Sequence, residues 1–238
     1  NALVFHGAAA LDLLASEISV LDFSGALYTV GWPQPPMAIQ DLEGTQLQVL
    51  TEGRIRDAVL ELVDSSVAGD QLDMEMFYLA HRPTIEALAR ASARGVAIRA
   101  LLDPNRDAFG REKNGIPNRQ AAWDLRDAGI AVRWCATSGE QCHTTLLMLA
   151  RENGATELLL GSANFTRRNL DNLNLETSVR LVSQDNAPVM RQARALFERN
   201  WSNPGGNLYS QPYEDFADHS RWRYGIYRFM EFSGLSTF

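Results

Sequence analysis

The stretch His143-Thr144-Thr145-Leu146-Leu147-Met148-Leu149-Ala150 is an apolar run that a histidine opens. The link Arg151-Glu152-Asn153-Gly154-Ala155 follows it, and residues 156–160 form a second apolar run. Asn-Gly in a short link between two such runs is a strong β-hairpin signal. We therefore expect two antiparallel strands, 144–150 and 156–160, with Gly161-Ser162-Ala163-Asn164 leaving the second strand as a turn.

Around this hairpin, strand and helix patterns alternate from Gln46 to Trp201. Alternating or continuous apolar runs predict strands at 46–50, 71–79, 96–102, 130–134 and 175–182. Helical periodicity predicts a helix carrying Ile55, Val59, Leu62 and Val63, and further helices from Pro83 to Gly95, at 119–128 and at 187–200. This order predicts an α/β fold with a mixed, mostly parallel sheet and helices on both faces.

Composition limits the class of protein. The chain has 238 residues, 45% of them hydrophobic, which is enough for one large domain or two small ones. The net charge of −7 argues against a nucleic-acid partner, because such proteins usually carry a basic face. No run of about 18 apolar residues is present, so we expect no membrane-spanning helix.

Two cysteines, Cys135 and Cys142, lie close together before His143. They could pair in an oxidising compartment, but two cysteines do not imply a disulfide framework. We expect two free thiols near a strand end.

The spacing at the hairpin suits phosphodiester chemistry. Residues i and i+2 of a strand point to the same side, so His143 shares a face with position 145. An imidazole can attack phosphorus there while a cation at i+2 stabilises charge on the phosphoryl oxygens. The turn would bring Ser162 and Asn164 to the same oxygens, and Gly161 would allow close backbone approach.

Glu176 lies in the following strand. We expect it to accept a hydrogen bond from the second ring nitrogen of His143, which would fix the tautomer.

These residues, in this order, resemble the phospholipase D superfamily, whose motif is H-x-K-x-x-x-x-D followed by G-S-x-N and a downstream Glu. The resemblance extends through Ser162-Ala163-Asn164-Phe165-Thr166-Arg167-Arg168 and Asn174, and upstream through residues 94–99 and Leu101-Leu102-Asp103, so that it covers roughly residues 45–200. It implies a phospholipase D-like fold, a phosphohistidine on His143, and no cofactor or metal. It also implies a second histidine, from another copy of the motif, that protonates the leaving alcohol.

The chain departs from that motif at two positions. Thr145 stands at the lysine position and Ala150 at the aspartate position. Losing one group that stabilises the oxyanion typically costs about 10²–10³ in rate, so we expect this copy to be impaired. The aspartate is commonly described as structural support, so Ala150 has the milder effect.

Only one copy of the motif is present. A missing N-terminal segment or a second chain related by a two-fold axis would supply the other. The start Asn1-Ala2-Leu3-Val4-Phe5, followed by Leu11, Leu13 and Leu14, weakly repeats the order from Asn174-Leu175 to the helix at 187–200. This repeat favours a preceding half. We therefore interpret residues 1–44 as the tail of a preceding half or a linker, 45–201 as the phospholipase D-like domain, and 202–238 as a C-terminal arm.

Two further segments attract interest. Residues 103–119 are polar and follow a strand end, which is either a ligand crevice or a solvated loop. The candidate substrate-binding residues there are Asn105, Lys113, Asn118 and Arg119. The arm mixes aromatic residues with Arg221, Arg223 and Arg228. Such a segment can contact a membrane interface, but we favour one that covers an apolar surface of its own protein.

Three functions follow. The leading one is hydrolysis or phosphatidyl transfer on phospholipid phosphodiesters, in a bacterial-type enzyme similar to cardiolipin synthase that makes peripheral membrane contact. The second is a nuclease of the same superfamily. Only the basic residues of one loop favour it, namely Arg106, Arg111, Lys113 and Arg119. The third is a non-catalytic module that binds phosphate or lipid, which Thr145 at the lysine position favours. The sequence does not fix the compartment, although association with a bacterial membrane agrees with the first function.

Overall fold

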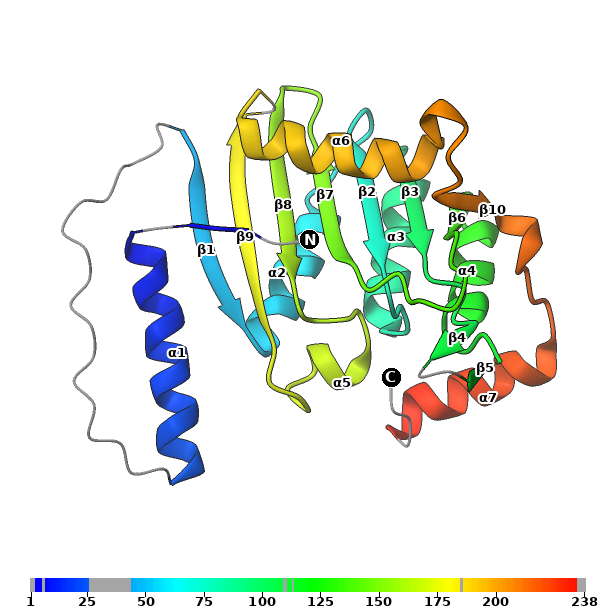
Figure 1. The fold of residues 1–238 in the computed structure, drawn as a ribbon, viewed down its shortest axis with the longest axis horizontal. Coiled ribbons are helices and arrows are strands. Elements are labelled where there is room, and N and C mark those ends of the chain that lie inside the picture. Colours follow the sequence, from blue (N-terminus) through cyan, green and yellow to red (C-terminus); the bar gives the residue numbers. More distant parts are fainter. Residues whose placement is uncertain are drawn as a thin grey trace.

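The computed structural model describes residues 3–5, 7–25, 44–108, 111–112, 114–184 and 186–234. One eight-stranded sheet forms its centre, in the order β1-β9-β8-β7-β2-β3-β6-β10 (Figure 1). Its strands are β1 (Gln46–Thr51), β2 (Gln71–Met76), β3 (Ala97–Leu102), β6 (Ala131–Cys135), β7 (Thr145–Ala150), β8 (Ala155–Gly161), β9 (Thr177–Gln184) and β10 (Ser210–Pro212). A separate small hairpin joins β4 (Asp107–Ala108) to β5 (Arg111–Glu112).

The helices lie between and around these strands. They are α1 (Ala8–Ser24), α2 (Gly53–Asp64), α3 (Arg82–Ala93), α4 (Asn118–Asp127), α5 (Arg167–Leu170), α6 (Pro188–Ser202) and α7 (Arg221–Ser233), with short 3₁₀ turns at Pro204–Gly206 and Tyr213–Asp215. No helix in the described part of the chain is long and apolar enough to cross a bilayer.

The mixed sheet with helices on both faces is confirmed, but its strands are not mostly parallel. Only β2 with β3 and β3 with β6 pair in parallel; the other five pairings are antiparallel. The parallel pairs are those whose connections hold a crossover helix, α3 or α4. The 151–154 hairpin reverses the chain between β7 and β8, and β1 and β10 join the two edges in the antiparallel sense.

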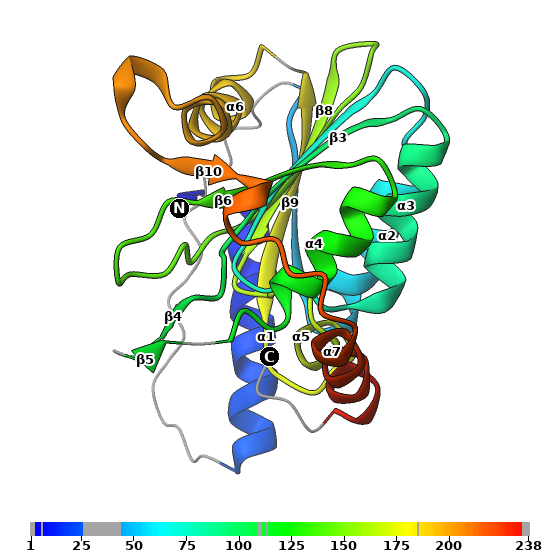
Figure 2. The same ribbon diagram turned by 90° about the vertical axis from the view of Figure 1, so that its right-hand side faces the viewer.

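Two apolar layers hold the helices to the sheet. On one face, α2, α3 and α4 cover a core in which Ile55, Val59, Leu62 and Val63 are buried, as their spacing predicts (Figure 2). On the other face, α6 buries Met190 and Phe197. Along β7 the side chains alternate accordingly, with Leu147 and Leu149 in the first core and Leu146 and Met148 in the second.

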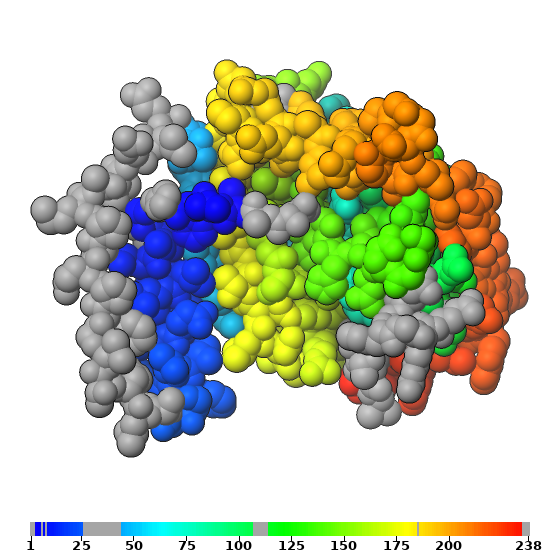
Figure 3. Space-filling model, in the orientation of Figure 1, coloured from blue at the N-terminus to red at the C-terminus, as the bar shows by residue number. Residues whose placement is uncertain are grey.

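The second face is covered incompletely. In the space-filling view α6 forms a ridge across its upper part, while residues of β8, β9 and the segment after β8 remain at the surface below it (Figure 3). Leu3 and Phe5 of the N-terminal segment pack partly buried against this second core.

Within the expected C-terminal arm, the described residues 202–234 include β10, two 3₁₀ turns and α7. Ser210 of β10 pairs with Cys135 and extends the sheet by one strand. Helix α7 then crosses the lower edge of the sheet (Figure 1), where Tyr227 is fully buried against Ala80 and Ile116. The expected covering of the protein's own apolar surface is therefore present on one side of α7.

Cys135 and Cys142 are not free thiols, because they form a disulfide. Cys135 ends β6, and the chain turns back within seven residues to approach β7. The two Cα atoms consequently lie 6.1 Å apart, within the range that a disulfide spans. Sequence spacing alone did not show that the chain reverses here.

Candidate active site

The expected catalytic residues meet at the lower edge of the sheet, where β2 and β8 end and β7 and β9 begin. His143 is exposed just before β7, and Thr145 is its half-buried first residue. By strand alternation, Thr145 lies on the same side as Leu147 and Leu149. A cavity of about 310 Å³ adjoins this point, lined in part by His143, Thr145 and Gly161 together with Leu3 and Phe5.

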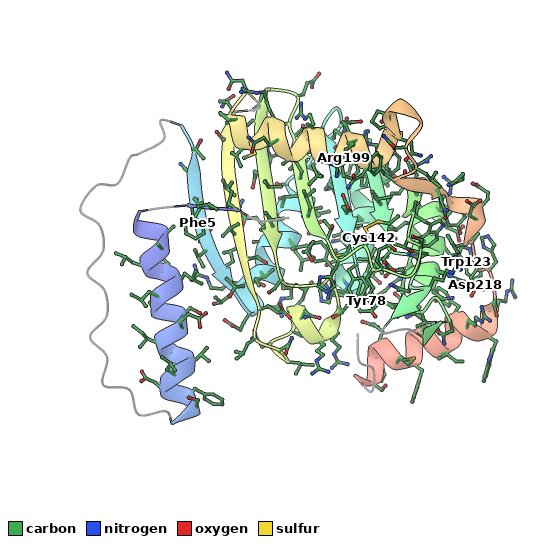
Figure 4. The ribbon with its side chains drawn as sticks, viewed as in Figure 1. Phe5, Tyr78, Trp123, Cys142, Arg199 and Asp218 are labelled. Carbon is green, nitrogen blue, oxygen red and sulfur yellow. A yellow bond between two sulfur atoms is a disulfide. The ribbon has the colours of Figure 1, made fainter. Side chains whose placement is uncertain are left out.

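The segment after β2 positions His143. The ring centroids of Phe77 and His143 lie 4.6 Å apart at an interplanar angle of 37°. The Phe77 N–H also donates to the Thr144 carbonyl at 3.0 Å, which extends the β2–β7 pairing past the strand ends. Figure 4 labels Tyr78 and Cys142, which come from the two segments that adjoin His143. The sequence analysis placed Phe77 in a strand but did not identify it as a residue of the site.

Asn164 is oriented by the same segment. Its Oδ1 accepts a hydrogen bond from the Tyr78 N–H at 3.1 Å. A backbone N–H can only donate, so this bond fixes which end of the amide is the oxygen. The Asn164 NH₂ group is left as a donor with no partner among the described residues, and it can donate to an anionic oxygen.

Glu176 has partners other than the expected one. It is buried, and its carboxylate accepts hydrogen bonds from the Ser162 hydroxyl and from the Asn169 and Asn174 amides, the last at 2.7 Å. Within the described chain it receives no bond from His143, so that expectation is wrong for this structure. The reason is proximity in the sheet, because Ser162 follows β8 and Glu176 precedes the neighbouring strand β9.

This network fixes the Ser162 hydroxyl. Its oxygen also accepts from the Thr177 N–H at 3.1 Å while its proton is directed to Glu176. Asn174 belongs to the run that carries the family resemblance, so the sequence held a signal for it. Asn169 had none; it is placed by α5, whose N-cap Thr166 side chain accepts from the Asn169 N–H.

Gly161 allows β9 to approach β8 closely, whereas the sequence analysis expected a close backbone approach at the phosphoryl oxygens. A Cβ built there would lie 2.5 Å from the Ser178 Cα and 2.5 Å from the Thr177 carbonyl oxygen, closer than atoms can pack. Both are backbone atoms, so β9 would have to move away from β8.

We expect Gly161→Ala to lower the free energy of unfolding by about 1–3 kcal/mol, because overpacking at this point displaces backbone. Urea denaturation of the variant beside Gly154→Ala measures the effect. Gly154 is the matched control for a glycine in the same hairpin: its added Cβ meets only the Gln184 side chain, at 3.7 Å, although its positive φ adds backbone strain. Equal stabilities for wild type and Gly161→Ala would contradict the prediction.

The polar segment after β3 supports the site from behind. Asn105 and Asn118 are buried, and both side-chain NH₂ groups donate to the Phe77 carbonyl, at 3.2 and 2.7 Å. Asn118 Oδ1 accepts from the Leu79 N–H at 2.8 Å, and the Arg119 Nε donates to the Pro104 carbonyl. The two asparagine side chains thus brace residues 77–79, whereas Arg119 binds the turn after β3. None of these hydrogen bonds joins the three residues to His143. Lys113 lies outside the described residues.

Asp103 connects this segment to the residue before His143. One of its carboxylate oxygens accepts from the Asn105 N–H and the other from the Cys142 N–H, both at 2.7 Å. Cys142 directly precedes His143, so the end of β3 positions the segment that enters β7. The resemblance included Asp103 without assigning it a role.

Glu75 lies buried beside the disulfide. Burial raises the pKa of this carboxyl group, although hydrogen bonds from Asn200 and Thr144 oppose the shift. Its carboxylate and the sulfurs of Cys135 and Cys142 lie within 4.8 Å of one another. Because the sulfurs are bonded together, the cluster offers no thiolate, and it does not fit a metal site as it stands.

Comparisons with known proteins agree with this geometry. Residues 60–201, more than half of the chain, match the family model described as the phospholipase D-like domain of cardiolipin synthase. No curated protein matches the chain.

Among solved structures, Nuc from Salmonella typhimurium, a phospholipase D family member, has a TM-score of 0.52 at 21% identity, covering 71% of this chain and 99% of its own. NucT from Helicobacter pylori has a TM-score of 0.50 at 12% identity, covering 65% and 94%. Phosphatidylserine synthase from Haemophilus influenzae has a TM-score of 0.52 at 11% identity, covering 85% of this chain but 48% of its own. With the match over residues 60–201, the chain belongs to the phospholipase D-like family.

Proposed function

We propose that residues 45–201 form one half of an active site that hydrolyses phospholipid phosphodiesters or transfers their phosphatidyl group, and that Thr145 impairs this half. The observation that carries the proposal is the meeting of exposed His143, the Asn164 amide and the Ser162–Glu176 pair at one end of the sheet. Family membership supports the reaction class, and the likeness to phosphatidylserine synthase agrees with a lipid substrate.

His143 would act as the nucleophile. An imidazole nitrogen attacks phosphorus, an N–P bond forms, and the bond from phosphorus to the leaving alcohol oxygen breaks. A histidine of the second half would protonate that oxygen. Water or another alcohol then attacks phosphorus and releases His143, which gives hydrolysis or transfer respectively.

Asn164 would bind the phosphoryl oxygens. Its NH₂ group can donate to one of them, since its oxygen accepts from Tyr78. The Ser162 hydroxyl donates its one proton to Glu176, so this pair would position the turn that carries Asn164. Thr145 lacks the charge that a lysine would place on this face, so charge developing on the oxygens is incompletely stabilised.

A second half completes the proposal. The chain covers about half of phosphatidylserine synthase and nearly all of Nuc, so the likenesses accommodate both a preceding half and a second copy. We favour a preceding half, with residues 1–44 as its tail or linker.

Restoring the charge tests the function. We expect Thr145→Lys in the full-length protein to raise turnover of phosphatidylglycerol by about 10²–10³, because position 145 shares a face with His143. Release of the head group is measured beside cleavage of DNA. Thr137→Lys is the control, since it adds the same charge at a half-buried threonine in the loop before His143.

DNA cleavage without lipid turnover would replace the lipid proposal by a nuclease. Binding of phosphatidylglycerol without either activity would replace it by a non-catalytic module.

A further inference from the structure

Helix α7 has one buried side and one open side. On the inner side, Tyr227 is fully buried and the Tyr224 hydroxyl donates to Asp124 at 2.8 Å. On the outer side, three aromatic side chains are largely exposed: Trp222 by 76%, Phe229 by 62% and Phe232 by 78%. Side chains extend from α7 away from the sheet (Figure 4).

The exposed aromatics form one continuous stripe. Trp222 and Phe229 are seven residues apart, which places them two turns apart on the same side of the helix, and Phe232 follows one turn later. Gly225 lies between them on this side, and a Cβ added there would meet no atom within 4 Å. The stripe is therefore open along its length in the described part of the protein.

The charge of α7 differs from that of the whole chain. The helix carries three arginines and one glutamate, a net charge of +2, whereas the chain carries −7. Arg221 borders the stripe and is exposed, and Arg168 is exposed on neighbouring α5. A helix with bulky aromatic residues on one side and arginine beside them suits an anionic lipid surface, into which the rings insert while the cations meet phosphate groups.

The stripe lies at the active-site edge of the molecule. Helices α5 and α7 lie side by side along the lower edge of the sheet (Figures 1 and 2), and Arg167 of α5 donates to the Phe232 carbonyl of α7. On its inner side, α7 contacts Ala80, two residues after Tyr78, whose N–H orients Asn164. A surface bound by the stripe would therefore lie near the site.

We infer that the outer side of α7 binds the surface of an anionic phospholipid bilayer and thereby holds the active-site edge against it. The reason for its location rests on the proposed function, whereas the binding itself does not.

A second protein copy fits the stripe less well. A large aromatic side chain presents about 150–250 Å², so three partly exposed ones offer roughly 300–550 Å². A stable protein–protein interface needs about 800 Å² from each partner. A bilayer has no such requirement, because each ring that inserts contributes on its own.

Vesicle binding tests the inference. The full chain is floated with vesicles of phosphatidylglycerol and phosphatidylcholine, and with vesicles of phosphatidylcholine alone. We expect the triple variant Trp222→Ser, Phe229→Ser, Phe232→Ser to bind the anionic vesicles at least about tenfold more weakly than wild type, because it loses the inserting surface. Binding of wild type should also weaken as salt rises, because the arginine charges are screened.

The control removes the same number of exposed apolar side chains elsewhere. Phe23→Ser, Val67→Ser, Leu208→Ser changes residues that are 93%, 58% and 62% exposed, and it should bind like wild type. Matching thermal melts of both triple variants establish that each folds. Equal binding by wild type and the α7 variant, or no binding by either, would overturn the inference. The inference would also be overturned if sedimentation showed a wild-type dimer that the α7 variant does not form, and if wild type did not bind vesicles.

The two proposals fail separately. Binding that depends on α7, with no lipid turnover after Thr145→Lys, would keep the surface and reject the function. If the α7 variant turned over lipid in vesicles as fast as wild type, the proposed function would stand and the proposed membrane-binding surface would be rejected.

Discussion

Replacing His143 by alanine in the Thr145→Lys protein is expected to lower phosphodiester turnover by at least about 10³, because the attacking atom is removed. The measurement uses the Thr145→Lys background, because under the proposed function Thr145 would lower the starting rate from which a loss is measured. The loss is measured as the ratio of phosphatidylglycerol turnover by the Thr145→Lys protein to turnover by the protein that carries both Thr145→Lys and His143→Ala. The single variant should also trap an acid-labile phosphoryl adduct that the double variant does not form.

His219→Ala is the matched control for this experiment. His219 is also exposed, but its ring contacts Trp123, at a centroid distance of 5.1 Å, on the α4 side of the molecule. Its replacement should leave turnover unchanged. Full activity in the protein without His143 would show that another group attacks phosphorus, and the proposed mechanism would be abandoned.

Removing the Cys135–Cys142 disulfide is expected to lower the free energy of unfolding by roughly 2.5 kcal/mol, the entropy that closing so short a loop removes from the unfolded chain. The bond joins residues seven apart. Urea denaturation of Cys135→Ser, Cys142→Ser beside wild type measures the difference, and the same comparison under reductant is the control. The two curves should coincide under reductant, because wild type then lacks the bond as well.

The same disulfide constrains the loop before His143. Cys142 is tied to Cys135 through the bond and to Asp103 through its N–H, one residue before His143. Disulfides persist in oxidising compartments, so the effect depends on the environment of the protein. Identical stabilities of wild type and double variant under oxidising conditions would contradict the prediction.

Periodic patterns in the sequence predicted most elements between residues 46 and 202. The 3.6-residue spacing of Ile55, Val59 and Leu62 identifies α2, and the link around Asn153-Gly154 identifies the hairpin of β7 and β8. These signals are local, since each depends on residues that are near one another in the chain. Helix α7 was not predicted, although its apolar residues recur with a helical periodicity as clear as that of α3 and α4.

Partners distant in the chain were predicted less well. The sequence analysis predicted a hydrogen bond from His143 to Glu176. In the structure, the Glu176 carboxylate instead accepts hydrogen bonds from Ser162, Asn169 and Asn174. It proposed Asn105 and Asn118 as substrate contacts, and their amides brace the Phe77 carbonyl. In both cases the residue type is consistent with either role. The choice depends on which backbone groups the fold brings within hydrogen-bonding distance.

The sequence by itself determined the order of His143, Ser162, Asn164 and Glu176 that resembles the family motif, and it determined that a threonine stands at position 145, because these are properties of the residues in line. Only the tertiary structure decided that most strand pairs are antiparallel, that the two cysteines are joined, and that Trp222, Phe229 and Phe232 remain exposed while Tyr227 is buried. The strand pairings and the burial of Tyr227 depend on contacts between segments far apart in the chain, and the disulfide depends on the reversal of the chain between β6 and β7. Their energies are set by packing and hydrogen bonding across the whole fold, and no local pattern encodes them.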